Sequence, residues 1–250
     1  MSDVWAECGA RARCIPLAGE VLRLVESQEQ VATRGLVATL AEQELLESLL
    51  EAAKPPLPPA TRSLHYLLST PFRYPPLRYG SRFGGRHEPS LFYASRSVDT
   101  VLAESAFYRY VFWEGMATPP SAPLRTEHTL FGARVRTRKA YDLRAPPFDA
   151  HRERLTSPGD YTATQALGTA LRAAGAEAIE FESARDAGRG SNVALFTPRA
   201  FAATRPTFSE EWLCETQADC VSFYARGREG VRSFARQQFT VAGALPRPAA

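Results

Sequence analysis

Apolar residues recur at steps of three and four positions through the early part of the chain, from about Leu17 to Ala53, with Glu, Gln and Arg between them. This spacing places the apolar side chains on one face of a helix. The proline-rich sequence KPPLPP at residues 54–59 would end the helical region and form a stiff connector. We therefore expect a helical N-terminal extension over residues 1–60 and a separate domain over residues 61–250.

Beyond the connector, the spacing of the apolar residues changes several times between the two-residue period of a strand and the longer period of a helix. This predicts short strands and helices in mixed order. Ser97 is a typical N-cap and opens a predicted helix that runs to about Trp113. In HTLFGARVRTRKAYDL, the alternation of Phe131, Ala133 and Val135 predicts a half-buried strand. Further strands are predicted at SLFYAS (90–95), AIEFES (178–183), NVALF (192–196) and around the turn RGREG (226–230), and a helix at TATQALGTALRAAG (162–175). Together these elements predict an α+β fold.

The composition is that of a globular protein, with 44% apolar and 23% charged residues. A net charge of +3 is too small to indicate nucleic-acid binding by itself. The spacings of Cys8, Cys14, Cys214 and Cys220 fit neither a redox CxxC motif nor a usual zinc pattern, so we expect free thiols and no metal site. No segment has the apolar length of a signal peptide or a membrane span, which predicts a cytoplasmic protein.

The stretch TPFRYPPLRYGSRFGGR at residues 70–86 combines four arginines with aromatic rings, prolines and glycines. Guanidinium groups and rings together suit a ligand that is both anionic and flat. A nucleotide held by its phosphates is one such ligand, and RNA with bases stacked between the rings is another. The RNA alternative would use Arg62, Arg73, Arg78, Arg82 and Arg86 with Tyr66, Phe72, Tyr74, Tyr79 and Phe83.

Glu104 stands on a mostly apolar face of the helix predicted from Ser97, with Val101 and Phe107 three positions to either side. A lone carboxylate is costly to bury unless another group pairs with it. Glu104 is therefore either half of a structural salt bridge with an arginine or a carboxylate that acts on a ligand.

Two further residues carry weaker signals. In AIEFES the two-residue period puts Ser183 on the same strand face as Ile179 and Phe181, where the chain turns into a glycine-bearing loop. A strand-end serine commonly bonds only its own backbone, but it could also serve a ligand. Tyr93 shares a strand face with Leu91, which by itself indicates core.

Taken together, these residues resemble the RES-domain family, named for its arginine, glutamate and serine. The resemblance is carried by FRYPPLRYGSRFGGRHEPSLFYASRSVDTVLAES and by AIEFESARDAGRGSNVALF, and covers about residues 62–198. Arg82 matches the arginine near the glycine-rich turn, with Arg86 as a rival for that position. Tyr93, Glu104 and Ser183 match the strand tyrosine, the helix glutamate and the strand-end serine.

Arg73 and Tyr74 are similar to an earlier Arg-Tyr pair of the same family, across a shorter gap than the family pattern has. The resemblance implies that Arg73 and Arg82 hold the pyrophosphate of NAD and that Tyr74 and Tyr93 flank its nicotinamide ring. It also implies that Glu104, with Arg82 and Ser183, forms the catalytic group.

For the whole protein, the resemblance implies an ADP-ribosyltransferase-like fold, with a mixed or antiparallel β core and flanking helices. The implied substrate is NAD, consumed as the toxin of a toxin–antitoxin system whose antitoxin is an Xre-like DNA-binding protein. A Rossmann G-x-G-x-x-G motif is missing from the sequence, so NAD would be degraded rather than used as a hydride carrier.

Several alternatives stay open from the sequence. Phosphate, water or a protein side chain could accept the ADP-ribose, so phosphorolysis, hydrolysis and mono-ADP-ribosylation are all compatible with the motifs. An RNA-binding module without catalysis, or an interaction protein that binds through its N-terminal helices, would explain the arginine-rich stretch or the extension alone. Neither explains both Glu104 and Ser183. Residues 1–60 could also serve the antitoxin contact or a homo-oligomer.

Overall fold

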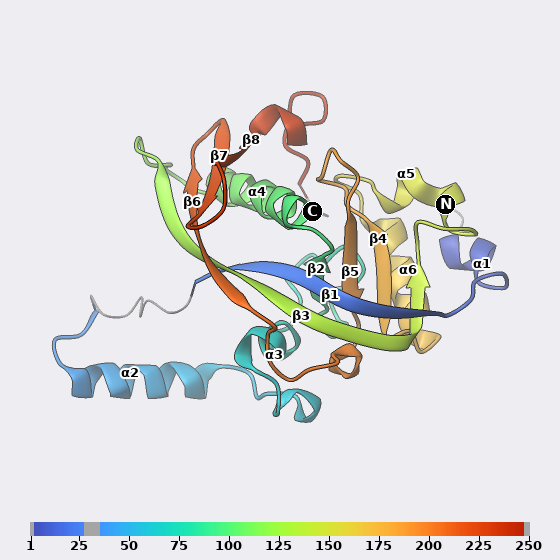
Figure 1. Ribbon diagram of the computed structural model, residues 1–250, viewed down its shortest axis with the longest axis horizontal. Helices are drawn as coiled ribbons and strands as arrows, with labels where there is room; N and C mark the ends of the chain where they lie inside the picture. The colour runs from blue at the N-terminus through green and yellow to red at the C-terminus, as the bar shows by residue number, and fades with distance from the viewer. Residues whose placement is uncertain (1–2, 28–35, 248–250) are drawn as a thin grey trace.

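The computed structural model describes residues 3–27 and 36–247. Within these residues eight strands form one curved, mostly antiparallel sheet with helices on its outer faces, which confirms the α+β class (Figure 1). The strands are β1 (Ile15–Glu26), β2 (Phe92–Ser95), β3 (Leu124–Asp142), β4 (Ala178–Glu182), β5 (Ser191–Leu195), β6 (Ser209–Thr216), β7 (Cys220–Ala225) and β8 (Arg232–Ala235). The helices are α1 (Val4–Cys8), α2 (Leu40–Ala53), α3 (Tyr66–Arg73), α4 (Val98–Glu114), α5 (Arg152–Leu155) and α6 (Thr162–Ala173).

The sheet has the order β1-β2-β5-β4-β3-β6-β7-β8, and β1 also pairs with β3. Because β1 pairs with both β2 and β3, the strands β1, β2, β5, β4 and β3 close into a ring. The β1–β3 pairing is antiparallel and extends from the Ile15–Ala140 pair to the Glu26–His128 pair, whereas β1 meets β2 only at Leu22–Ser95. The β6–β7–β8 ribbon extends the sheet from the outer edge of β3.

The core follows from this ring. One cluster of buried residues fills the ring itself, with side chains such as Val21, Phe92 and Phe131, and α3 covers it from one side. A second cluster lies between β4, β5 and α6, and a third lies under α4 against β1, β6 and β7. Successive residues of β1 therefore face different clusters. The cluster on one side of the strand includes residues of α3, and the cluster on the other side includes residues of α4.

The helix expected from about Leu17 to Ala53 is wrong over its first part, because Ile15–Glu26 is strand β1. The strand is apolar on both faces: Val21 and Val25 point into the ring, and Leu22 and Leu24 point toward α4. A strand covered on both faces has no clean alternation, so its residues also satisfied helical spacing. This part of the N-terminal region belongs to the sheet and is not a helical extension.

The second part of that prediction is confirmed by α2, although its leucines are not packed. None of the α2 residues is buried, and Leu45 and Leu49 each keep 59% of their surface exposed. The expected segment also includes residues 28–35, which lie outside the described residues. Most other expected elements are confirmed, including the Ser97 cap of α4, the inward face of β3 and the glycine after α6, where Gly175 has φ +80°.

Candidate active site

Glu104 lies on α4 and is held by two hydrogen bonds to one oxygen. The Ser183 hydroxyl donates to Oε1 at 2.6 Å, and the Asn192 side-chain amide donates to the same oxygen at 2.6 Å. Glu104 has no ion pair within the described residues, so the structural salt bridge considered from the sequence is not what holds it. No hydrogen bond from the described part of the chain occupies Oε2, which leaves that oxygen available to a ligand.

Strands β2 and β5 fix the orientation of the Asn192 amide. Ser95 of β2 donates its hydroxyl proton to Asn192 Oδ1 at 2.6 Å, and the two residues are direct neighbours in the strand pairing. Because Oδ1 accepts from Ser95, the NH₂ end must point toward Glu104. Ser95 and Asn192 are both buried, so the pair forms a rigid support beneath the carboxylate.

Ser183 is placed by the loop that follows β4. Its Oγ accepts from the backbone N–H groups of Arg185 and Asp186, at 3.1 and 3.0 Å, while donating to Glu104. It therefore makes the local backbone contacts of an ordinary strand-end serine and also a long-range contact to α4. The loop is fastened to α4 by the Thr100 hydroxyl, which donates to Asp186 at 2.8 Å. Gly190 keeps this approach open, because a Cβ there would lie 1.9 Å from Thr100 Oγ1.

Two buried guanidinium groups flank Tyr161 beside this loop. Arg82 lies over the Tyr161 ring at 4.4 Å and donates to the Ser157 carbonyl at 2.9 Å. Arg185 donates to the Tyr161 hydroxyl at 3.1 Å and lies 3.4 Å from the centre of the Phe107 ring. Arg82 is 9% exposed and Arg185 is 5% exposed.

Neither arginine is paired with a carboxylate in the described parts of the chain. The Nη1 atom of Arg185 is buried without a hydrogen-bond partner there, and burial lowers the pKa of this residue. Two buried cations without an acidic partner favour an anion at this place.

Glycine allows the segment that carries Arg82 to come close to α6. Gly168 of α6 lies against the backbone of Phe83, where a Cβ would be 2.0 Å from the carbonyl oxygen. Tyr161 begins the same helix, so this contact sets the distance between Arg82 and the ring on which it stacks.

Tyr108 stands one helical turn from Glu104 on α4, and 49% of its surface is exposed. Although the residue reaches solvent, its hydroxyl is surrounded by protein, and burial raises its pKa. The neighbouring Tyr161 and Glu104 raise the pKa further. Tyr108 therefore lies near both Glu104 and Tyr161, and part of its surface reaches solvent beside them.

Tyr93 supports the turn that carries Arg82. Its hydroxyl is 2.8 Å from Ser81 Oγ and accepts from the Phe83 backbone N–H at 3.0 Å. Burial raises the pKa of Tyr93 to about 12. Tyr93 packs on Phe181, so it belongs partly to the core, as its strand face indicated, and partly to the wall of the site.

Arg73 and Tyr74 are placed elsewhere. Arg73 forms an ion pair with Glu51 at 2.7 Å and donates to the Pro55 carbonyl at 2.6 Å, which ties it to the end of α2. Tyr74 follows directly and is 40% exposed. Arg86, the rival of Arg82, is exposed, whereas Arg82 is buried against Tyr161. The structure therefore brings Glu104, Ser183, Arg82 and Tyr93 around one region and leaves the Arg73–Tyr74 pair outside it.

Sequence reasoning missed Asn192, Arg185 and Tyr161 as site residues. Asn192 could have been found, because a polar side chain on the strand NVALF has no place in an apolar face. Arg185 follows Ser183 by two positions, but nothing local distinguishes it from the many surface arginines. Tyr161 carries no signal in its own segment, since its role depends on arginines from two distant loops.

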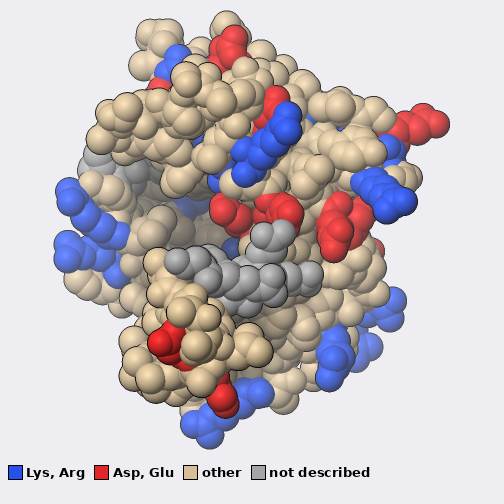
Figure 2. All heavy atoms as spheres, turned by 90° about the vertical axis from the view of Figure 1, so that its left-hand side faces the viewer, with Lys and Arg blue, Asp and Glu red and all other residues tan. Residues whose placement is uncertain are grey.

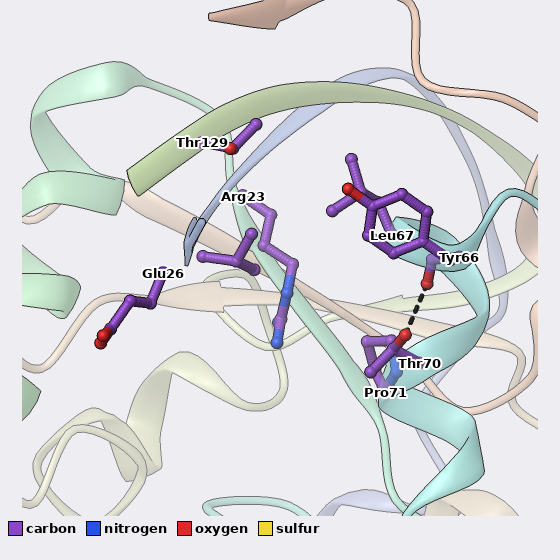
Figure 3. Close-up of a pocket in the computed structure, with 8 residues that line it drawn as sticks. Arg23, Glu26, Tyr66, Leu67, Thr70, Pro71 and Thr129 are labelled. Atoms are coloured by element: carbon purple, nitrogen blue, oxygen red, sulfur yellow. Dashed lines mark hydrogen bonds between the residues drawn. The ribbon is translucent and has the colours of Figure 1, made fainter. Parts of the chain in front are cut away.

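Two hollows in the described residues lie away from this cluster. One, of about 550 Å³, is lined by residues of β3, β6 and β7 together with Ser27 and Arg226. The other, of about 50 Å³, lies between β1, β3 and α3 (Figure 3). Neither is lined by a residue of the Glu104 cluster, which lies on the α4 side of β1.

Comparison with known families gives the class of the protein. A family model described as the RES domain matches residues 57–217, which is more than half of the chain. The protein therefore belongs to the RES-domain family, and the matched region includes Glu104, Ser183, Arg82 and Arg185.

A search of the curated proteins gives no match. A search of solved structures finds a chain in "Crystal structure of the M. tuberculosis MbcT-MbcA toxin-antitoxin complex", with a TM-score of 0.48 and 11% sequence identity. The alignment covers 83% of the present chain and 91% of that one. In the described residues no helix is both long and apolar enough to cross a membrane.

Proposed function

We propose that the protein cleaves the bond between nicotinamide and ribose in NAD and acts as the toxin of a toxin–antitoxin pair. One observation carries the proposal: the Glu104 carboxylate is fixed through Oε1 by Ser183 and Asn192 while Oε2 stays available. A carboxylate held in this way without an arginine partner is suited to act on a ligand rather than to stabilise the fold.

The chemistry requires a negative charge at this point. When the glycosidic C–N bond breaks, its electron pair leaves with nicotinamide, whose ring nitrogen becomes neutral, and positive charge develops on the ribose. The same type of cation forms in glycoside hydrolysis. Glu104 would stabilise it and hold a ribose hydroxyl or the incoming nucleophile through Oε2. Phosphate or water then adds to the ribose carbon, and a water nucleophile gives up a proton.

Arg82 and Arg185 supply the charge that the pyrophosphate of NAD needs. Both are buried beside Tyr161 and lack a carboxylate among the described residues. A guanidinium group binds phosphate oxygens through two coplanar N–H donors. Because a buried guanidinium group has already lost most of its hydration on folding, binding an anion requires less further desolvation of the cation. The exposed Tyr108 side chain would border the entry to the site.

The toxin role is proposed from the family to which the chain belongs. RES-domain membership is established for this chain. We propose as its partner an antitoxin of the Xre-like class, which would neutralise the toxin by covering the Glu104 region. DNA contact would then come only through the antitoxin. On the face that Figure 2 shows, basic and acidic side chains are interspersed, and no single basic field for RNA is formed there.

The test is NAD consumption by the purified protein, with and without inorganic phosphate, beside Glu104→Gln. Products are separated by chromatography. We expect nicotinamide release by the wild type and a loss of about 10²–10³-fold in rate for the variant, because glutamine keeps the shape but loses the charge. ADP-ribose 1″-phosphate, formed only with phosphate present, would identify phosphorolysis, and free ADP-ribose would identify hydrolysis.

The control is Glu114→Gln at the far end of α4, where the carboxylate pairs with Arg236. This variant removes an acidic charge from the same helix and should keep wild-type activity. Equal NAD consumption by wild type and Glu104→Gln would overturn the assignment of the carboxylate. No nicotinamide release under any condition, including with a cell extract that supplies protein acceptors, would overturn NAD cleavage itself.

A further inference from the structure

Arg23 lies on the opposite side of β1 from the Glu104 cluster. Along the strand it shares a face with Val21 and Val25, which belong to the core inside the ring, whereas Leu22 and Leu24 pack toward α4. Its guanidinium group lies 5.2 Å from the centre of the Phe92 ring. Arg23 therefore places a cation at the end of an apolar core, beneath helix α3 (Figure 3).

This cation is poorly satisfied. Its Nη1 donates to the Tyr93 carbonyl at 2.6 Å, but its Nε is buried without a hydrogen-bond partner in the described residues. The ion pairs of the described chain do not include Arg23. Burial lowers its pKa to about 10, which reflects the cost of a charge that protein and water together solvate incompletely.

A small pocket of about 50 Å³ opens beside Arg23. On a comparable measure a single water needs roughly 10–15 Å³, so the pocket has room for a group the size of a carboxylate or phosphate. Thr70 and Pro71 of α3 line the side across from Arg23, and Thr129 of β3 lines another.

The nearest acidic side chain in this pocket is already engaged. Glu26 lies at the rim and forms an ion pair with Arg109 of α4 at 3.2 Å. In Figure 3 its carboxylate points away from the Arg23 guanidinium. The pocket therefore offers a positive charge at Arg23, and the one acidic side chain among its described lining residues is paired with Arg109.

We propose that the Arg23 pocket binds a phosphate-type oxyanion, either free in solution or carried by a nucleotide. The guanidinium group brings a cation without an ion pair to the wall of the pocket, and a charged contact with the anion would relieve the cost of burying that cation. Because the pocket between β1 and α3 has a volume of only about 50 Å³, it can hold the oxyanion group itself but not the rest of a larger ligand. This site is separate from the one proposed for NAD cleavage, since the sheet lies between them.

The test is the thermal stability of the Glu104→Gln protein and of the same protein carrying Arg23→Met, so that NAD is not consumed. Inorganic phosphate is added against sodium chloride of equal ionic strength, and NAD is added in a second arm. We expect phosphate at ten times its Kd for this pocket to raise the Tm by roughly 3 °C, and Arg23→Met to remove this contribution while leaving any phosphate effect that comes from the Arg82–Arg185 site. If Arg23→Met also lowers the effect of NAD on the Tm, the phosphate is carried by the nucleotide. If only inorganic phosphate loses its effect, the anion is free.

Arg125→Met serves as the matched control, because Arg125 is an exposed surface arginine whose side chain is 82% accessible. It should keep the phosphate effect in full. Methionine preserves the stem that covers Phe92, so without added anion Arg23→Met should fold with a Tm at or above that of its parent. A phosphate effect as large in Arg23→Met as in its parent, or one that sodium chloride reproduces, would overturn the proposal. A Tm well below that of the parent without anion would also contradict it.

Discussion

Helices α4 and α2 begin in the same way and end up in different surroundings. Each follows an extended N-cap residue, Ser97 or Thr39, whose hydroxyl accepts from the backbone N–H three positions later. Both carry leucines and glutamates. Yet α4 buries Leu102 and Phe107 completely, whereas α2 buries no residue.

This comparison separates what is local from what is tertiary. Capping and spacing decide where a helix starts, and they act in both segments. Whether a carboxylate on the helix becomes part of a site depends on what lies opposite. On α4, strands β4 and β5 bring Ser183 and Asn192 to Glu104. On α2, Glu51 pairs with Lys54 and Arg73 at the surface.

The largest expected difference concerns the arginines near each helix. Replacing Arg185 with Met, or Arg82 with Met, should lower kcat/KM for NAD by about 10²-fold or more, because each removes a buried cation that the proposed function assigns to the pyrophosphate. Arg73→Met should change it by less than about threefold, because Arg73 is bound to Glu51 and Pro55. The measurement is the steady-state rate of nicotinamide release.

Circular dichroism and thermal unfolding of the three variants would show whether lost activity reflects lost folding. If Arg73→Met is folded and loses as much kcat/KM for NAD as Arg185→Met, the expected difference between the two arginines is wrong. It would place the end of α2 at the site and restore the role that the family resemblance gives to the Arg73–Tyr74 pair.

The second expected difference is in stability. Leu102→Ala on α4 should lower the free energy of unfolding by about 2–5 kcal/mol, because the side chain is fully buried and leaves a cavity. Leu49→Ala on α2 should change it by less than about 0.5 kcal/mol, since the residue is mostly exposed. Urea unfolding at several protein concentrations measures both. A cost above about 1 kcal/mol for Leu49→Ala would mean that α2 is covered in solution.

The sequence predicted most elements because their signals are local. The N-cap of α4, the alternation within β3 and the glycine after α6 each act within a few residues. Strand β1 was missed because it is covered on both faces, by the ring interior and by α4, and neither neighbour is visible in its own segment. The exposure of α2 was hidden for the same reason, since a leucine-rich face does not reveal whether anything covers it.

The candidate site divides in a similar way. The Glu104–Ser183 contact could be anticipated from the family resemblance, and the structure joins the two at 2.6 Å. Arg185 and Tyr161 could not, because their partnership brings together a loop after β4 and the start of α6. The same limit applies to Arg73. Its pairing with Glu51 depends on α2 folding back toward α3, which no motif records.

A buried histidine beside α4 should make stability depend on pH. His128 of β3 is 5% exposed, and its pKa is lowered to about 4, mainly by burial and in part by the nearby Arg109 guanidinium of α4. In the unfolded chain a histidine titrates near pH 6.5. The unfolded state therefore binds the extra proton first, and stability falls as the pH drops from about 6.5 to 4. The loss attributable to His128 should be at most about 3 kcal/mol.

Urea unfolding of wild type and His128→Gln between pH 4.5 and 7.5 measures this contribution. The variant should show a flatter dependence on pH, because it carries no group that titrates in this range at position 128. Identical slopes for the two proteins would contradict the assignment. Leu49→Ala, as a change on α2, should leave the wild-type slope in place.

The smallest expected difference lies in the two caps themselves. Ser97→Ala should lower the free energy of global unfolding by about 1 kcal/mol, because α4 unfolds only with the sheet on which it packs. Thr39→Ala removes an equivalent bond, together with half of a capping box shared with Glu42. Because α2 buries no residue, the loss should stay local and leave global unfolding unchanged within about 0.5 kcal/mol. Hydrogen exchange would show faster exchange of the α2 amides alone, whereas a global loss from Thr39→Ala equal to that from Ser97→Ala would show that α2 is coupled to the sheet.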